Sequence, residues 1–207
     1  VTVGADGVRY AAWADSRNGN YEIYVARESA AGWEMLGGSA AGGGVSDSQT
    51  DSRQPALLVF DGRPTVVWTE VNGNGTDIMG AQYGAGTDTW VTLGNSLLPG
   101  GISLTTRADR AQIIEADDRM LVTWIDTSSG TSQVYAKVFD GVAWVEITPG
   151  SASGLGITQA RPPVSEYDVA AEGGNIAVTW SGGFGDEVEV FARVRAGAGW
   201  VGLAGSE

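Results

Sequence analysis

Residues 10–33 read YAAWADSRNGNYEIYVARESAAGW and contain two tryptophans, Trp13 and Trp33. The chain repeats this pair three more times, and the four pairs include all eight of its tryptophans. The first members of successive pairs lie 55, 56 and 56 residues apart. A fixed period of this size indicates a repeat architecture. The later pairs are Trp68 and Trp90, Trp124 and Trp144, and Trp180 and Trp200.

Each repeat alternates short apolar runs with turn residues. In the first repeat, residues 2–3, 8–13, 21–27 and 33–36 predict strands, and Asn18-Gly19 predicts a tight hairpin turn. The other repeats follow the same plan, and none shows helical periodicity. The fold class predicted is therefore all-β, a β-propeller with four blades of four antiparallel strands and about 56 residues per repeat.

We expect one propeller domain over residues 1–207, with blades at approximately 1–48, 49–104, 105–158 and 159–207. A single small sheet cannot bury both of its faces, so the blades must pack on one another, and large aromatic side chains dominate such contacts. We therefore predict that all eight tryptophans form the core between blades. The alternative for them is an aromatic platform for a sugar.

The closure of the propeller stays open at this stage. The four blades could close on themselves, join a second chain as a homodimer in an eight-bladed ring, or belong to a longer array.

Composition and charge exclude several classes of function. The net charge of −13 repels phosphate, so we expect no nucleic acid partner. The absence of Cys and His excludes disulfides, thiolate zinc sites, cysteine nucleophiles and histidine bases. No apolar run approaches the roughly 18 residues of a membrane span, so we expect no membrane insertion. Because the chain opens at Val1 without Met or a signal-like segment, we expect a processed or excised piece.

The hairpin before each second tryptophan resembles the Asp-box of bacterial sialidase-type propellers. In that family, Ser-x-Asp-x-Gly-x-Thr-Trp joins the third and fourth strands. The matching places here are 29–33, 84–90, 140–144 and 196–200; they keep the Trp and a nearby Gly or Asp, but no copy has the whole box. Residues 13–24 are also similar to blades of secreted bacterial proteins. The resemblance implies a propeller from an exported bacterial protein, extracellular or at the cell surface.

A ligand site is expected where loops converge. In a propeller of this plan, the second-to-third loops and the fourth-to-first connections project from one face, which is the default binding face. The ligand-binding residues predicted are Arg17, Asn18, Arg53, Asn72, Asn74, Arg107, Asp126, Arg161 and Asp186. The same loops also carry Asp15, Asn20 and Asp77. For the arginines, the alternative is that they pair with acids across blade junctions.

Calcium is the one cofactor that the loops suggest, and we expect none to be required. Calcium takes six to eight oxygen ligands, which Asp, Asn and Glu side chains supply. Ordinary turn chemistry is the alternative, since Asn and Asp favour hairpin turns for backbone reasons. The metal ligands predicted are Asp15, Asn18, Asn20 and Glu22.

An acid follows the first tryptophan of a pair by two residues at Asp15, Glu70 and Asp126, and Gly182 breaks the pattern. These acids could form a ring of carboxylates, or each could cap its loop by accepting backbone N–H groups.

No catalytic residue is predicted. Sialidase-like catalysis needs a Tyr nucleophile beside a Glu, and strand alternation sends the neighbours Tyr21 and Glu22 to opposite faces. The function expected is a non-catalytic binding or scaffold module that recognises a glycan or a protein through one loop face. Two alternatives stay open: a fragment of a sialidase-like glycoside hydrolase, and a structural module that assembles into a larger ring.

Overall fold

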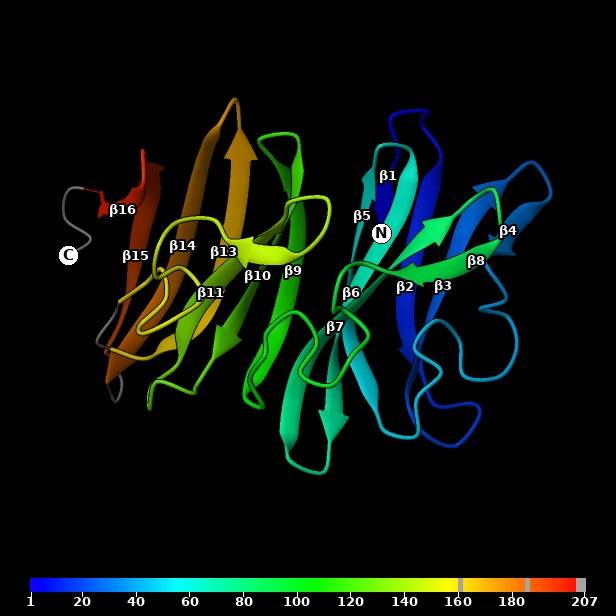
Figure 1. Ribbon diagram of the computed structural model, residues 1–207, viewed down its shortest axis with the longest axis horizontal. Helices are drawn as coiled ribbons and strands as arrows, with labels where there is room; N and C mark the ends of the chain where they lie inside the picture. Colours follow the sequence, from blue (N-terminus) through cyan, green and yellow to red (C-terminus); the bar gives the residue numbers. More distant parts are fainter. Residues whose placement is uncertain (160–161, 185–186, 204–207) are drawn as a thin grey trace. The chain divides into compact units, whose positions relative to one another are not determined.

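In the computed structural model the described residues form sixteen strands (Figure 1). The structure describes residues 1–159, 162–184 and 187–203, and no helix occurs in this part of the chain. The first sheet contains β1 (Thr2–Val3), β2 (Arg9–Asp15), β3 (Glu22–Ser29) and β4 (Gly32–Met35). The second contains β5 (Ser52–Phe60), β6 (Arg63–Asn72), β7 (Gly75–Gly84) and β8 (Thr89–Thr92). The third contains β9 (Ala108–Ala116), β10 (Arg119–Asp126), β11 (Gln133–Phe139) and β12 (Trp144–Glu146). The fourth contains β13 (Val164–Glu172), β14 (Asn175–Phe184), β15 (Glu187–Ala196) and β16 (Gly199–Gly202).

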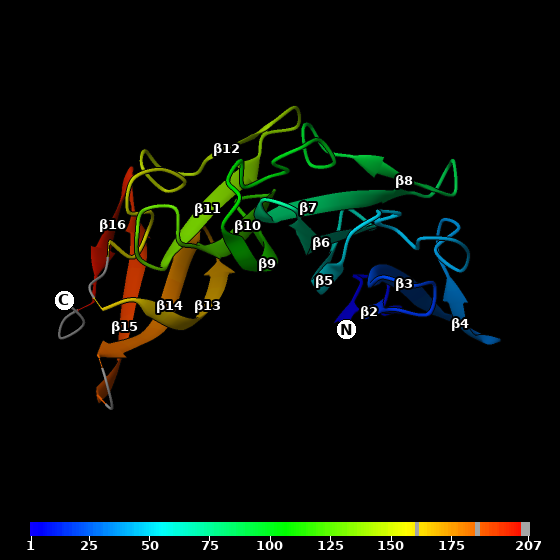
Figure 2. The same cartoon turned by 90° about the horizontal axis from the view of Figure 1, so that it is seen from below.

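The strands of each sheet are hydrogen-bonded in chain order and are antiparallel. Each sheet lies within one of the four predicted blades, and long irregular connections follow β4, β8 and β12 (Figure 2). Four sheets of four antiparallel strands are the blades of a propeller, so the predicted fold class is confirmed.

The chain divides into two compact units, Val1–Ile113 and Ile114–Glu207, and the boundary falls within β9. Each unit has its own apolar core. That residues 1–207 form one domain stays a prediction.

The core of the first unit lies between its first and second sheets. Trp68 of β6, 1% exposed, packs in one cluster with Ile23 and Val25 of β3, which are fully buried. Leu36 and Val45 belong to the same cluster and come from the connection after β4.

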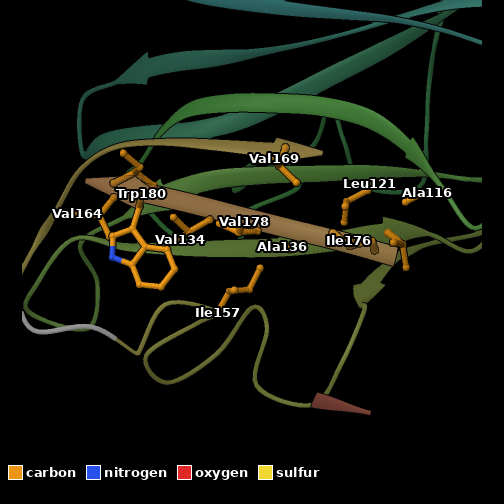
Figure 3. Close-up of a cluster of buried hydrophobic side chains, with 12 residues drawn as sticks. Ala116, Leu121, Val134, Ala136, Ile157, Val164, Val169, Ile176, Val178 and Trp180 are labelled. Atoms are coloured by element: carbon orange, nitrogen blue, oxygen red, sulfur yellow. The ribbon is translucent and has the colours of Figure 1, made fainter. Parts of the chain in front are cut away.

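The core of the second unit repeats this arrangement between the third and fourth sheets (Figure 3). Trp180 of β14, 3% exposed, packs in one cluster with Val134 and Ala136 of β11. Ile157, from the connection after β12, completes the contact. In both units, a tryptophan of one blade therefore packs on the third strand of the blade before it.

The eight tryptophans differ in burial. Trp68, Trp124, Trp144 and Trp180 are buried, and Trp13, Trp90 and Trp200 are partly buried. The prediction of a core position is wrong for Trp33, whose residue is 56% exposed.

The contacts of the equivalent tryptophans explain why Trp33 is exposed. Trp90 donates its indole N–H to the Leu36 carbonyl at 3.2 Å, and Trp200 donates its own to Thr148 Oγ1 at 2.9 Å. Both acceptors belong to the connection of the preceding blade. Trp33 lies in the first of the described sheets, so no connection of a preceding described blade can accept its indole N–H.

One short segment recurs in the connections that leave the first three sheets. Its copies, which we call latches, are Gly44-Val45-Ser46, Gly101-Ile102-Ser103 and Gly156-Ile157-Thr158. The middle residue of each latch donates its N–H to a carbonyl of the third strand: Val45 to Ile23 at 2.6 Å, Ile102 to Ile78 at 2.6 Å, and Ile157 to Val134 at 2.8 Å.

The latch hydroxyl also accepts a hydrogen bond from the N–H of the same strand residue. The N–H groups of Ile23, Ile78 and Val134 donate to the latch hydroxyl at 2.9, 3.1 and 3.2 Å. The fourth strand of each blade is short and pairs only with the later part of the third strand. The latch therefore satisfies backbone groups that would otherwise be buried without partners.

The latch glycine is required by two constraints. Gly156 has a φ of +61°, and a Cβ there would lie far inside van der Waals contact with the Val134 carbonyl oxygen. Gly154, two residues earlier, has a φ of +58° but no atom within 4 Å of such a Cβ. Comparing substitutions at Gly156 and Gly154 therefore separates the cost of backbone strain from the cost of steric overlap.

We predict that Gly156→Ala lowers the free energy of unfolding by about 3 kcal/mol, because overlap with Val134 adds to the strain of a left-handed alanine. Gly154→Ala should cost only about 1 kcal/mol, from the strain alone. Urea unfolding followed by tryptophan fluorescence measures both. Equal losses in the two variants would contradict the latch geometry.

Candidate functional site

A polar side chain stands near the start of the third strand in each of the first three blades. These residues are Glu22, Asp77 and Gln133, and all are at most 5% exposed. Each is the cross-strand partner of the acid that follows the first tryptophan by two: Asp15 with Glu22, Glu70 with Asp77, and Asp126 with Gln133. Cross-strand partners lie on the same face of a sheet, so each pair brings two polar groups together.

In the first and third blades this residue reaches the latch. Ser46 Oγ donates to Glu22 Oε2, and Thr158 Oγ1 donates to Gln133 Oε1 at 2.6 Å. Both side chains have two methylene groups, which span the gap to the latch hydroxyl.

In the second blade the contact is missing because Asp77 is one methylene shorter. Ser103 Oγ donates instead to the Gly100 carbonyl at 3.4 Å. Asp77 Oδ2 accepts a hydrogen bond from Asn72 Nδ2 at 2.6 Å. Asp77 Oδ1 is buried and has no hydrogen-bond partner. The second blade therefore departs from its neighbours at one buried polar atom, and such departures indicate a functional position.

Asp77 lines a pocket of about 510 Å³ between the β6–β7 hairpin and the connection after β8. Polar groups come from Glu70, Asn72 and Asn74, and the apolar lining includes Met79. The connection after β8 supplies the rest: Leu97, Pro99, Gly100, Leu104, Thr105 and Thr106. The pocket thus lies where a second-to-third loop meets a fourth-to-first connection, as the predicted binding face requires.

The two carboxyl groups of the pocket have different surroundings. Glu70 accepts hydrogen bonds from Thr50 Oγ1 and Ser52 Oγ, both at 2.5 Å, and from Trp68 Nε1 at 3.0 Å. Burial raises the pKa of Asp77, and the nearby charge of Glu70 raises it further, against the opposing effects of the Asn72 amide and the Gly100 N–H. Glu70 is thus held by the chain, whereas Asp77 is suited to keeping a proton at a higher pH than an ordinary aspartate.

Among the predicted ligand residues, the structure brings Asn72 and Asn74 to this pocket, where the Asn74 N–H donates to Asn72 Oδ1 at 2.8 Å. Arg107 lies next to it, because it forms a parallel bridge with Thr76 of β7. Arg161 and Asp186 lie outside the described residues.

Two of the predicted ligand arginines, Arg17 and Arg53, form ion pairs with acids close to them in the chain. Arg17 contacts Asp15 at 2.6 Å and lies over the Tyr24 ring. Arg53 contacts Asp51 at 2.6 Å and lies over the Tyr21 ring. Each ion pair joins residues two apart in the chain. The stacking of Arg53 on Tyr21 bridges the first and second blades, whereas the contacts of Arg17 stay within the first.

Asn18 and Asp126 form hydrogen bonds within their own blades. Asn18 Nδ2 donates to Tyr24 Oη at 3.1 Å and to the Gly42 carbonyl. Asp126 is fully buried and accepts from the Ser128 N–H at 2.7 Å. Asp15 likewise accepts from the Arg17 N–H at 2.8 Å, so the capping interpretation holds for both acids.

The four predicted calcium ligands take part in hydrogen bonds within the first blade. Asp15 binds Arg17, and Glu22 accepts from Ser46 Oγ and from the Ser48 N–H. Asn20 Nδ2 donates to Glu22 Oε1 at 2.7 Å. Within the described ranges, no group of three or more His, Cys, Asp or Glu side chains could hold a metal ion. Calcium binding stays a prediction.

From the sequence, Asp77 is expected in a loop, and the structure places it in β7. Glu70 is expected only as a loop cap or as a member of a carboxylate ring, and the latches are not predicted. A signal for the latches exists, because Gly-Val-Ser, Gly-Ile-Ser and Gly-Ile-Thr begin at positions 44, 101 and 156. The unpartnered oxygen of Asp77 has no sequence signal, because it depends on a reach that differs by one methylene.

The comparisons with known proteins show the fold. No family model and no curated protein matches the sequence. Solved glycoside hydrolases are similar in structure. A family 32 β-fructofuranosidase from Bombyx mori has a TM-score of 0.53 and 13% identity, over 98% of this chain and 49% of that chain.

Two bacterial enzymes show comparable similarity. Levansucrase from B. megaterium has a TM-score of 0.57 and 11% identity, over 99% of this chain and 66% of that chain. An endo-arabinase from Bacteroides thetaiotaomicron has a TM-score of 0.55 and 14% identity, over 97% of this chain and 75% of that chain. This chain spans about half the length of the β-fructofuranosidase. These neighbours support the propeller fold that the resemblance implies. The assignment to the Asp-box, sialidase-type family stays a prediction.

Among the residues that the structure describes, no helix is long and apolar enough to cross a bilayer.

Asp77→Asn should change how stability depends on pH. The folded pKa of Asp77 lies above the ordinary value of 3.8, so the folded state keeps a proton that the unfolded chain releases. This contribution to stability is present below the unfolded pKa and is lost as pH rises through the folded pKa. We expect the variant to gain stability relative to the natural chain between about pH 4 and pH 7 in urea unfolding.

Asp61→Asn is the control for this experiment, since its carboxylate is 80% exposed in a turn of the same blade. A constant difference across the pH range for Asp77→Asn would rule out a raised pKa.

Asp77→Gln should restore the contact that the other blades make. Glutamine matches Gln133 in length and can accept from Ser103 Oγ, so we expect a gain of about 1 kcal/mol in the free energy of unfolding near pH 7. The gain should vanish when Asp77→Gln is compared with the natural Asp77 in chains that both carry Ser103→Ala. A gain that survives the loss of the hydroxyl would mean that the new side chain acts by other means.

Proposed function

We propose that this chain is a carbohydrate-active propeller module that binds a sugar in the pocket at Asp77. The observation that carries the proposal is Asp77 itself, a buried acid with an unpartnered oxygen in the one described blade that loses the contact with its latch. Buried polar atoms are normally satisfied, so a ligand hydroxyl is a natural partner for this oxygen.

The lining of the pocket suits a sugar. Sugars present hydroxyl groups on their edges and C–H groups on their faces. Asn72, Asn74 and Thr105 offer amide and hydroxyl partners, and Met79 and Pro99 offer apolar surface. A few convergent polar groups in a mostly apolar pocket are typical of small-molecule sites.

Glycoside hydrolysis is the second candidate function, and the raised pKa of Asp77 favours it. Hydrolysis needs a carboxylic acid that still holds its proton at working pH and gives it to the leaving oxygen. Asp77 fits that role, with the Glu70 carboxylate beside it in cross-strand register. The structural neighbours are named for fructosides, levan and arabinan, so furanose sugars are the first substrates that we propose. Such polysaccharides accord with an extracellular location.

The proposal predicts that fructo- or arabino-oligosaccharides bind, measured by isothermal titration calorimetry. Asn74→Ala should weaken binding about tenfold, through the loss of one or two hydrogen bonds. If the chain also cleaves the sugar, Asp77→Asn should lower kcat by about 10²–10⁴-fold in a reducing-sugar assay, through the loss of the proton donor.

The control is again Asp61→Asn, which should leave both readouts unchanged. Binding without turnover would assign a binding module, and turnover lost in Asp77→Asn would assign a hydrolase. No binding and no turnover, or binding indifferent to Asn74 and Asp77, would sink the proposal for this pocket.

A further inference from the structure

The contact between consecutive blades occurs twice with the same chemistry. In the first unit, Val66 and Trp68 of the second sheet pack on Ile23 and Val25 of the first sheet. In the second unit, Val178 and Trp180 pack on Val134 and Ala136 (Figure 3). The following blade thus supplies a Val-x-Trp pair, and the preceding blade supplies its third strand.

A second tryptophan secures the edge of each contact. Trp90 and Trp200 donate their indole N–H groups to the connection that leaves the preceding blade, at Leu36 and Thr148. Leu36 itself is 2% exposed in this arrangement. The interface therefore has two sides. We call the surface that carries the two tryptophans the donor side, and the surface formed by the third strand and the connection of the preceding blade the receiving side.

The first sheet presents a donor side that its own unit does not cover. Ala11 and Trp13 occupy the positions of Val66 and Trp68, yet both are only partly buried. Trp33 occupies the position of Trp90 and is 56% exposed. Ala11 and Trp13 carry no charge, and their cross-strand partners Ala26 and Tyr24 are buried within the same blade, with Arg17 lying over the Tyr24 ring.

The fourth sheet presents a receiving side that its own unit does not cover. Val190 occupies the position of Ile23 and Val134, which are fully buried, and is itself 74% exposed. Leu203 occupies the position of Leu36 and is 47% exposed; its N–H likewise donates to the third strand, at the Ala192 carbonyl. The β14 and β15 side chains at the centre of this face are uncharged: Ala177, Thr179, Ser181, Val190, Ala192 and Val194. The neighbouring strand β13 adds two exposed acids to the same face, Glu166 opposite Ser181 and Asp168 opposite Thr179.

We propose that these two surfaces bind each other between two copies of the chain, the first sheet of one copy packing on the fourth sheet of its partner. Trp13 would cover Val190, as Trp68 covers Ile23, and Trp33 would lie against Leu203. The occupant is a second copy because the chain itself carries both halves of an interface that it builds twice internally. Two copies related by a twofold axis form this contact twice, once with each copy supplying its first sheet.

Electrostatics sets the conditions for association. The net charge of −13 makes two copies repel each other, and Glu166 and Asp168 add negative charge to the fourth-sheet surface. Salt screens the repulsion and leaves the apolar contact intact, so association should strengthen as salt rises.

The test is solution mass, measured by light scattering coupled to size exclusion at several protein and salt concentrations. The natural chain should approach twice its 21.4 kDa, more completely at higher salt. Val190→Glu and Trp33→Glu should each return the mass to one chain, and both positions are exposed, so the fold is kept. Val142→Glu, at a turn position that is 79% exposed, is the matched control and should leave the mass unchanged.

Mixing the two variants tests the pairing itself. A Val190→Glu copy keeps its first-sheet surface, and a Trp33→Glu copy keeps its fourth-sheet surface, so the mixture can form one intact interface. Recovery of two-chain mass in the mixture, and not in either variant alone, is expected. A natural chain of single mass at every concentration would overturn the proposal. So would a dimer indifferent to Trp33→Glu, which would indicate a symmetric pairing of fourth sheets.

Discussion

The architecture depends on the backbone groups at the start of each third strand. The fourth strand is too short to pair with this stretch, so the N–H and carbonyl groups of Ile23, Ile78 and Val134 need other partners. The latches supply them, and in the same step they place Val45, Ile102 and Ile157 in the interior. One local arrangement therefore satisfies the backbone, and in each unit it also completes the apolar surface on which the next blade packs.

The candidate site arises from a small change in that arrangement. Glu22 and Gln133 reach their latch hydroxyls, but Asp77 stops one methylene short. The loss of that contact leaves an acid with a raised pKa and an unpartnered oxygen in a pocket. The surrounding fold tolerates the change because the Ile102 N–H still donates to the Ile78 carbonyl and Ser103 Oγ still accepts from the Ile78 N–H. Stability and a chemically distinct site thus coexist in the same repeat.

The same repeat logic accounts for the exposed apolar residues at the two ends of the chain. Trp33 and Val190 are exposed, whereas their equivalents in the other blades are buried or partly buried, and this difference is the basis of the proposed contact between copies. Trp180 shows a related end effect, since Gly182 stands where Glu70 and Asp126 accept an indole N–H, and its own Nε1 has no partner. Blades with the same backbone arrangement therefore differ in which apolar side chains they leave exposed and which polar atoms they leave without a hydrogen-bond partner.

The sequence alone determined the all-β class and the number of sheets, because the tryptophan period and the turn residues are local signals. It expected Asn72, Asn74 and Asp77 in one loop, whereas the structure places Asn72 at the end of β6 and Asp77 within β7. It could not determine the burial of each tryptophan, which depends on whether a preceding blade covers it, as Trp33 and Trp68 show. Nor could it separate Asp77 from Glu22, since both read as acids near a hairpin. Only the tertiary structure decided that one reaches its latch and the other does not, because that outcome is set by a distance across the fold.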